Sequence, residues 1–219
     1  MARGASLARR YAERRFAVLF GVLLVTIAGH GFVAALLPIV NPLDWLLGLS
    51  LLAVVLSARR GGLGWSVRGL AVAFVATRLA YPLLDHHAPL ITSQLLLATA
   101  CLLAASVAAR RALGAGPVDA EHIFAALDAY ILAGIAFGVG YWSLEALAPG
   151  SFSTGAHAMT PPRAVYFSFV TQATVGYGDI VPLSDAAQGV VVAQGVGGQM
   201  YLAVLVARLV SLYSRRADR

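Results

Sequence analysis

The chain has 219 residues, of which 59% are hydrophobic and only 12% are charged, and its mean hydropathy is +0.79. In soluble domains about a quarter of the residues are usually charged, so the composition excludes an ordinary soluble domain and indicates a membrane protein. The formal net charge is +6, and every basic residue is an arginine. These arginines lie next to apolar runs, which suits membrane orientation and argues against nucleic-acid binding.

Six apolar segments are candidates for membrane-spanning helices, because a bilayer core of about 30 Å needs about 20 helical residues. They cover residues 16–40, 43–58, 63–84, 89–109, 121–148 and 185–213. The first follows a basic stretch, but it is too long for the core of a signal peptide, and we expect it to be retained. The sequence therefore predicts an all-α polytopic membrane protein with six transmembrane helices.

The arginines predict how these spans are oriented. With six spans, all arginines except Arg78 and Arg163 fall on one side of the membrane. The positive-inside rule then places both termini in the cytoplasm of a multi-pass protein of the cell membrane. The predicted domains are a cytoplasmic N-terminus at 1–15, a four-helix membrane domain at 16–111, a second membrane domain at 112–213 and a cytoplasmic tail at 214–219, with no soluble regulatory domain.

The segment between the last two spans begins with a helix signal. Pro161 and Pro162 suit the first turn of a helix, where a missing N–H costs nothing, and Thr160 is a candidate N-cap. About 12 residues follow before the next glycine, which is about 18 Å of helix. Such a helix reaches only halfway through a bilayer, so we expect it to be re-entrant and buried among other helices.

The chain must then return to the outside through Thr174–Asp179, which reads Thr-Val-Gly-Tyr-Gly-Asp. Extended backbone at membrane depth is tolerated where it lines a wet path. Gly176 and Gly178 accept positive φ, and an alternating backbone lets successive carbonyls point the same way. The carbonyls of Thr174, Val175, Gly176 and Tyr177, with the Thr174 hydroxyl, can then replace the water shell of a cation.

This stretch resembles the selectivity filter of the potassium channel family at every position from Thr174 to Asp179. The resemblance covers about 121–213 and implies that the second membrane domain is a pore domain, with an outer helix, a pore helix, a filter and an inner helix. Since one strand cannot surround an ion and the chain contains no second copy of the motif, we expect a fourfold homotetramer. K⁺ is then the permeant ligand, with no cofactor, and the partners are three identical subunits and membrane lipids.

The resemblance also implies roles around the filter. Tyr166 and Phe167 match pore-helix aromatic residues that pack around the filter, and Tyr166 is placed to hydrogen-bond Asp179. We expect Tyr177 to face away from the ions and join those aromatic residues. Val170 stands where some relatives carry a glutamate behind the filter, so we expect no inactivation controlled by that carboxylate.

In the last span, Gly198 matches the hinge position of the inner helix, and Gly195 is a second hinge candidate. The same glycines are also typical of close helix packing. Gln199 is a candidate for the water-filled cavity, and Gln194 competes with it for that role.

Gly134 and Gly138 form a small-residue pair that favours packing. Asp128 is an intramembrane carboxylate, which is either a functional group or the partner of an arginine. His86 and His87 could bind a metal or sense pH, although adjacent histidines are also typical of a wet loop.

Six spans with a pore loop before the last resemble voltage-gated channels, but the fourth span is uncharged until Arg110. Steep voltage gating needs several charges, so we expect weak voltage sensitivity. The sequence shows no catalytic constellation, and we do not expect an enzyme. The alternatives to a potassium channel subunit are a non-conducting regulatory subunit and a cation transporter.

Overall fold

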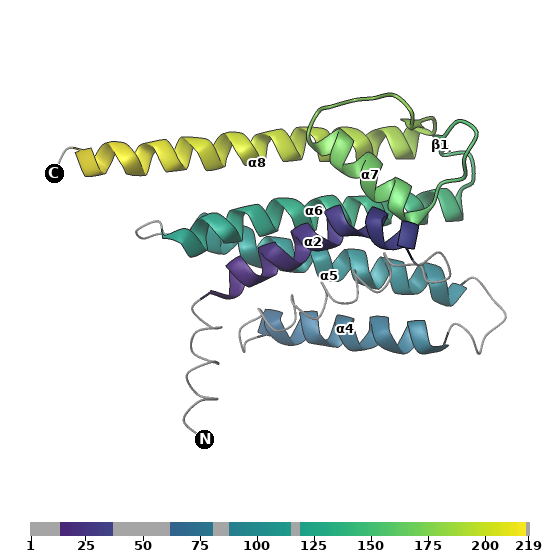
Figure 1. Ribbon diagram of the computed structural model, residues 1–219, viewed down its shortest axis with the longest axis horizontal. Coiled ribbons are helices and arrows are strands. Elements are labelled where there is room, and N and C mark those ends of the chain that lie inside the picture. The colour runs from purple at the N-terminus through teal and green to yellow at the C-terminus, as the bar shows by residue number, and fades with distance from the viewer. Residues whose placement is uncertain (1–13, 37–61, 81–87, 115–118, 218–219) are drawn as a thin grey trace, which may run out of the picture.

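The computed structural model of the protein describes residues 14–36, 62–80, 88–114 and 119–217. Its elements in chain order are α2 (Arg15–Leu36), α4 (Gly62–Ala80), α5 (Ala88–Ala112), α6 (Ala120–Leu147), β1 (Phe152–Ser153), α7 (Pro161–Gln172), β2 (Val181–Pro182) and α8 (Asp185–Ala217). Figure 1 shows the long helices side by side in layers: α4 lies on α5, α5 lies on α6, and α7 and α8 lie on the other side of α6. The predicted mostly helical architecture is confirmed for the described residues.

Helices occupy the positions of the predicted spans wherever the structure describes them. Those long and apolar enough to cross a membrane are Ile91–Ala112, Ala120–Leu147 and Asp185–Ser211, and Arg15–Gly29 is a shorter apolar helix. The predicted span at 43–58 lies outside the described residues. The structure thus supports a membrane protein with three membrane-capable helices, and the total of six stays a prediction.

The core lies where α5, α6 and α2 meet. Leu97 and Ala100 of α5 pack with Leu132 and Ile135 of α6 and with Leu23 of α2, and all five are buried. Small residues line much of the α5 face, so the backbones of α5 and α6 can approach closely. The first helices of the chain therefore support α6, which in turn supports α7.

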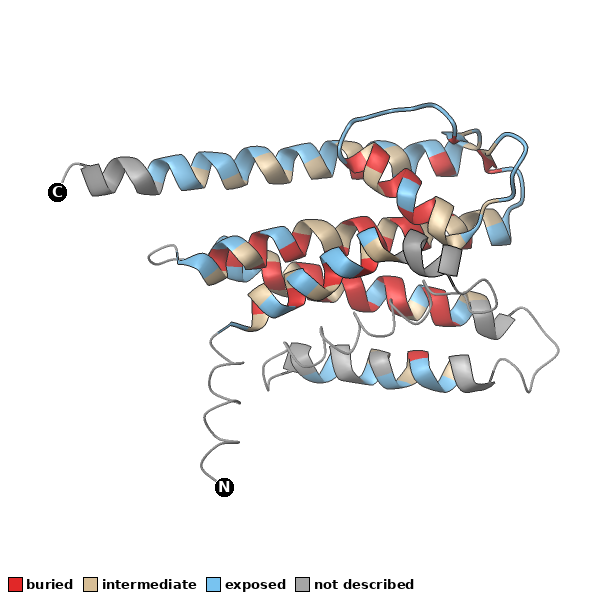
Figure 2. Ribbon diagram, in the orientation of Figure 1, coloured by how far each residue is buried: buried red, intermediate tan, exposed pale blue. Residues whose placement is uncertain are grey.

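Helix α8 is covered by very little of its own chain. In its most apolar stretch only 6% of the residues are buried, against 61% in α6. Figure 2 shows α8 as exposed or half-buried over most of its length, while buried residues follow α5 and α6. Because an apolar helix of this length needs apolar surroundings, lipid or other protein must cover α8.

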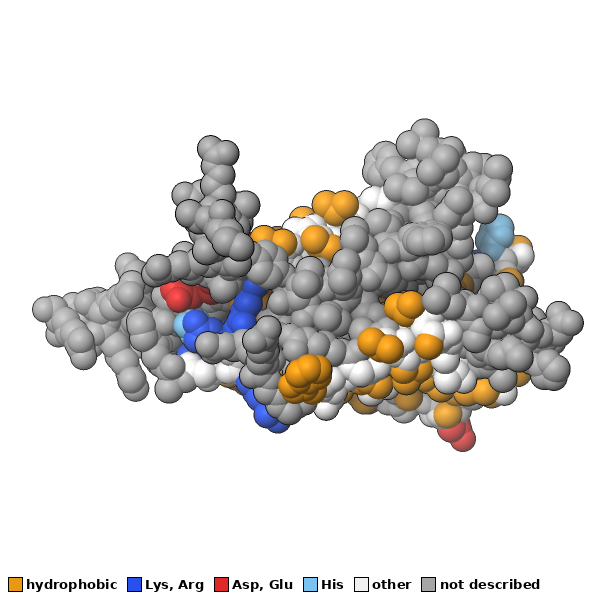
Figure 3. Space-filling model, turned by 90° about the horizontal axis from the view of Figure 1, so that it is seen from below, with side chains coloured by type: hydrophobic (Ala, Val, Ile, Leu, Met, Phe, Trp, Pro, Cys, Tyr) orange, Lys and Arg blue, Asp and Glu red, His pale blue; other side chains and the backbone are white. Residues whose placement is uncertain are grey.

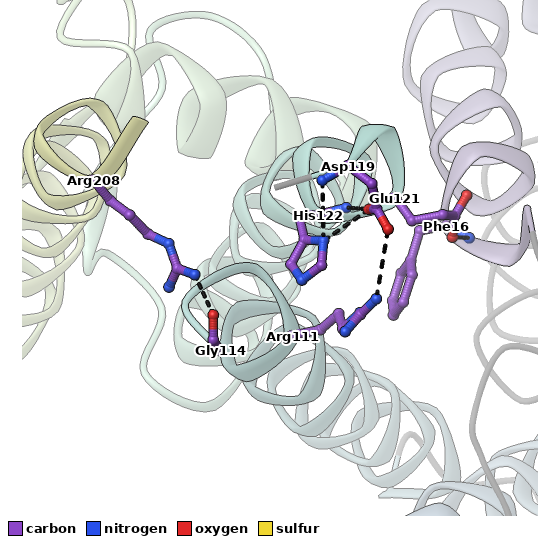
Figure 4. A network of polar contacts seen from close by, with 7 residues as sticks. All are labelled: Phe16, Arg111, Gly114, Asp119, Glu121, His122 and Arg208. Carbon is purple, nitrogen blue, oxygen red and sulfur yellow. Dashed lines mark hydrogen bonds and ion pairs between the residues drawn. The ribbon is translucent and has the colours of Figure 1, made fainter. Parts of the chain in front are cut away.

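The predicted cytoplasmic ends of the helices meet in a polar network (Figure 4). Asp119 caps α6 by accepting a hydrogen bond from the His122 backbone at 3.0 Å, and its carboxylate lies 2.7 Å from Nδ1 of the same histidine. These hydrogen bonds from the side chain and backbone of His122 lower the pKa of Asp119. Arg111 of α5 lies 4.0 Å from the Asp119 carboxylate.

Two further contacts bring α2 and α8 to the same end. Glu121 accepts a hydrogen bond from the Phe16 backbone at 3.2 Å, and Arg208 donates to the carbonyl of Gly114. In Figure 3 the visible arginine side chains gather at one end, whereas hydrophobic side chains cover the middle of the described surface. Arg111 and Arg208 thus lie at the end that is predicted to be cytoplasmic, and the orientation of the spans stays a prediction.

Two glycines bring helix α7 against α6. A Cβ atom on Gly138 would lie 2.6 Å from the Val165 Cα, and one on Gly134 would lie 2.5 Å from the Phe169 ring. These distances are shorter than real Cβ contacts. The predicted packing role of this glycine pair is therefore confirmed, and its partner is α7.

Asp128 of α6 is fully buried, and neither carboxylate oxygen has a hydrogen-bond partner. The arginine partner considered from the sequence is therefore not found among the described residues. Glu145 offers a contrast on the same helix, because its carboxylate accepts from the backbone N–H groups of Gly150 at 2.9 Å and Phe152 at 3.0 Å.

These two carboxylates predict opposite responses to truncation. Asp128→Ala removes two buried oxygens that make no hydrogen bond, so the melting temperature in detergent should stay the same or rise. Glu145→Ala leaves two backbone donors without their acceptor and should lower the stability by about 1–3 kcal/mol. A marked loss of stability in Asp128→Ala would show that the carboxylate has a partner in the assembled protein.

The glycine pair predicts a position-specific effect of one added methyl group. Gly138→Ala forces the α7 backbone away from α6 and should destabilise the protein by about 1–3 kcal/mol, measured by thermal unfolding in detergent. Gly140→Ala is the matched control, since a Cβ there meets nothing within 4 Å. Equal effects of the two substitutions would mean that helix propensity, not the contact with α7, decides stability.

Candidate functional site

The site begins with the short helix α7, which spans Pro161–Gln172 and has 12 residues, as predicted. Its length is about 18 Å, too short to cross a bilayer. Thr160 is the N-cap residue, but its side chain makes no capping hydrogen bond. Pro161 and Pro162 occupy the first turn and have no N–H, so there are fewer donors for a cap to satisfy.

The backbone after α7 alternates in handedness. φ is 57° at Thr174, 62° at Gly176 and 79° at Gly178, and no other non-glycine residue in the described part of the chain has positive φ. The positive φ expected at both glycines is present. Thr174 was not expected to share it, because a Cβ makes this conformation cost about 1–2 kcal/mol.

Both ends of this loop are held by hydrogen bonds to neighbouring segments of the chain. At its start, the Val175 N–H donates to the Val170 carbonyl at 2.9 Å, and the Thr174 N–H donates to Thr171 at 3.0 Å. At its end, β2 pairs with β1 in antiparallel register, and the Leu183 N–H donates to Ser151 at 2.8 Å. The loop is therefore stretched between two fixed points, which defines its path.

The loop is open to its surroundings within one chain. All of the predicted filter residues are exposed: Thr174, Val175, Gly176, Tyr177, Gly178 and Asp179. Val175 is 49% exposed and Tyr177 is 69% exposed. Apolar and aromatic side chains that leave so much surface uncovered, on a backbone held by hydrogen bonds, indicate an element that further protein covers.

The aromatic residues beside the loop divide into two groups. Tyr166 stacks on Tyr177 with ring centroids 6.3 Å apart and an interplanar angle of 4°, and its hydroxyl interacts with the Asp179 carboxylate. Phe167 points the other way, with its ring 5.2 Å from Tyr141 and 5.7 Å from Phe152. Within one subunit, Tyr166 therefore supports the loop, whereas Phe167 anchors α7 to α6 and β1.

Val170 is buried, and its carbonyl accepts the hydrogen bond from the Val175 N–H, while its role in supporting a filter stays a prediction. Helix α8 continues unbroken through the hinge candidates Gly195 and Gly198. A Cβ on Gly198 would lie 3.1 Å from the Gln172 Cγ, whereas one on Gly195 would meet nothing within 4 Å. Gly198 thus makes a close packing contact, and bending at either glycine stays a prediction.

The two glutamines considered for a cavity differ in their surroundings. Gln199 is exposed and donates a hydrogen bond to the Gln172 carbonyl at 3.3 Å. Gln194 is only 2% exposed and bonds to Ser168 of α7, which removes it as a cavity candidate. It belongs to a buried polar cluster with Gln172, which the sequence analysis missed. The available signal was that both are amides next to apolar residues.

A cation at this site would meet oxygen ligands of the backbone. No group of three or more His, Cys, Asp or Glu side chains able to bind a metal occurs within the described ranges. His86 and His87 lie outside those ranges. The oxygens that the loop offers are the carbonyls of Thr174–Tyr177 and the Thr174 hydroxyl, which are hard ligands suited to alkali and alkaline-earth cations.

Comparisons with known proteins match the same part of the chain. Residues 129–215 match a family model described as "Ion channel". Over 73 residues the chain is 38% identical to the two pore potassium channel c of Oryza sativa subsp. japonica. This match covers 33% of the chain and 14% of the relative, so the chain spans only a small part of that protein. No solved structure matches the chain.

The matched residues contain α7, the loop and most of α6 and α8. The geometry and the comparison therefore agree on the same module, and the ion channel family is not a family of enzymes. Over residues 129–215 this chain is similar to ion channels, and the potassium channel that it resembles matches a part of the chain of comparable length.

Proposed function

We propose that this chain is one subunit of a potassium-selective channel that conducts K⁺ passively through a central pore. The observation that carries the proposal is the loop after α7, where positive φ recurs at Thr174, Gly176 and Gly178. This alternation permits a stack of carbonyl oxygens at the spacing of successive residues, which suits a dehydrated monovalent cation. The similarity to a potassium channel supports the choice of K⁺.

Four copies of the chain form the pore in this proposal. The chain carries one filter motif, and its loop and α8 are largely uncovered by the rest of the chain. Fourfold symmetry would place four loops around one axis and cover the same surfaces on every subunit. Membrane lipids would surround the outer helices.

The proposal also includes an orientation and a gating property. The polar network places Arg111 and Arg208 at the end where α6 begins, which supports a cytoplasmic location for that end and for both termini. The only basic residues of α5 are Arg110 and Arg111 in its last turn. With so few charges available to cross the field, the channel should respond weakly to voltage.

A flux assay separates this proposal from the two alternatives. Purified protein in liposomes should admit K⁺ down its gradient, exclude Na⁺ and be blocked by Ba²⁺. A transporter would show saturable uptake coupled to H⁺ or Na⁺, and a non-conducting regulatory subunit would show no flux. Equal entry of Na⁺ and K⁺ would also contradict the proposal.

Two glycines with nearly the same backbone conformation provide a matched pair for that assay. Gly176 has a φ of 62°, and Gly155, which lies between β1 and α7, has a φ of 63°. A Cβ atom added at either position meets nothing within 4 Å in one chain. Alanine costs about 1–2 kcal/mol of backbone strain at both positions. Gly176→Ala should abolish K⁺ flux or its selectivity over Na⁺, whereas Gly155→Ala should leave both unchanged. Equal flux in the two variants would mean that Gly176 does not line the pore.

Native mass spectrometry of the protein released from detergent or nanodiscs tests the assembly. We expect a species of four times the 22.8 kDa of one chain. The reason is that a single loop supplies one side of each ring of oxygens. A stable monomer or dimer that still conducts K⁺ selectively would contradict the fourfold pore.

A further inference from the structure

A buried polar cluster lies behind the loop, at the meeting point of α6, α7 and α8. It contains Gln194 of α8, Gln172 and Ser168 of α7, and Tyr141 of α6, none more than 2% exposed. The Gln194 amide nitrogen lies 2.6 Å from the Ser168 hydroxyl and 3.0 Å from the Gln172 side-chain oxygen. Its amide oxygen accepts from the Tyr141 hydroxyl at 2.5 Å. We call these four residues the glutamine cluster.

The cluster is bound to the backbone of the outer helix as well. Ser168 donates to the Gly134 carbonyl at 2.6 Å, and Gln172 donates to the Tyr130 carbonyl at 2.8 Å. The Tyr130 hydroxyl donates back to the Gln172 carbonyl at 3.1 Å. None of the four side chains has a buried polar atom without a partner. A buried polar network that is fully satisfied fixes the helices that it joins, because any displacement leaves a desolvated group unpaired.

This network acts on the first residue of the loop. Gln172 is the last residue of α7 and lies two residues before Thr174. Because Gly198 has no side chain, α8 can pack closely against the side chain of Gln172. Thr174 has a positive φ, which a residue with a Cβ keeps only where the surrounding structure enforces it. The glutamine cluster supplies that enforcement from behind, and Gln199 of α8 adds a hydrogen bond to the Gln172 carbonyl at 3.3 Å.

We propose that Gln194 is a positioning residue for ion selectivity. Through Gln172 and Ser168 it holds the end of α7 in a fixed position relative to α8. This position sets the distance of Thr174 from the pore axis. This inference rests on the proposed channel function. Its distinct consequence is that loss of the Gln194 amide weakens K⁺ binding at the loop without removing any ion ligand.

The test compares Gln194→Met with Gln188→Met in the full-length protein. Methionine is similar in size and cannot replace the hydrogen bonds. Gln188 is an exposed glutamine on the same helix, whose side chain donates only to Leu183 at 3.3 Å. The readouts are the K⁺ concentration that half-maximally raises the melting temperature of the assembled protein, and the entry of Na⁺ relative to K⁺ in liposomes.

Gln194→Met should raise the required K⁺ concentration about tenfold or more and admit Na⁺, because buried partners lose their hydrogen bonds. Gln188→Met should match the unaltered protein. The proposal is overturned if Gln194→Met lowers the melting temperature equally at all K⁺ concentrations and keeps its selectivity, since the cluster would then only stabilise the fold.

If Gln194→Met does not assemble, the Tyr141→Phe variant tests the positioning role of Gln194 instead. It removes only the hydroxyl that Gln194 accepts from and keeps the ring that packs on Phe152 and Phe167. The same two readouts should shift in the same direction, by about two- to tenfold, and no shift in either overturns the proposal. If the unaltered protein shows neither K⁺-dependent stabilisation nor K⁺ flux, the proposed channel function itself fails, which is a different result from a K⁺-responsive protein with an inert Gln194.

Discussion

Non-helical backbone inside a membrane needs a hydrogen-bond partner for every N–H group and a partner or ligand for every carbonyl. With the loop after α7 inside the bilayer, as the proposed function has it, its N–H groups and its carbonyls meet this constraint differently. Its first N–H groups are bound by carbonyls of α7, for example Val175 by Val170, while the conformation of Thr174, Gly176 and Gly178 leaves carbonyls free. Everything behind the loop then has to resist its tendency to relax, because free carbonyls and a strained threonine are both unfavourable without a ligand.

The resistance comes from close packing and from buried hydrogen bonds acting together. Gly134 and Gly138 let α7 touch the α6 backbone, so that Ser168 reaches the Gly134 carbonyl at 2.6 Å. Gln194 of α8 then donates a hydrogen bond to the Gln172 side-chain oxygen, which joins α8 to the same group of contacts. A larger side chain at Gly138 would press on the α7 backbone at Val165, whereas one at Gly134 would displace the Phe169 ring. Packing and polar contacts behind the loop are therefore one interdependent unit rather than two independent contributions.

Much of this module could be predicted from the sequence, because its signals are local. Pro161 and Pro162 mark the start of α7, and the glycines of Thr174–Asp179 require positive φ whatever surrounds them. The glutamine cluster could not be predicted, since Gln194 and Gln172 are 22 residues apart and only the packing of α8 on α7 brings them together. Phe167 turned toward α6 for the same reason: neighbouring positions on a helix face different directions, and tertiary contacts decide which faces the loop. The absence of a partner for Asp128 is likewise a property of the packed helices.

The helices differ in how much of their surface is buried within the chain. Helices α5 and α6 bury many of their apolar residues against each other and against α2. Helix α8 is attached to the rest of the chain at several levels: Gln194 bonds to α7, the Tyr201 hydroxyl donates to the Ala126 carbonyl at 2.8 Å, and Arg208 donates to the Gly114 carbonyl. The level of Gln194 reaches the end of α7, because Gln194 donates to the Gln172 side chain and Gln199 donates to the Gln172 carbonyl. A shift of α8 at that level is therefore transmitted to the loop through Gln172.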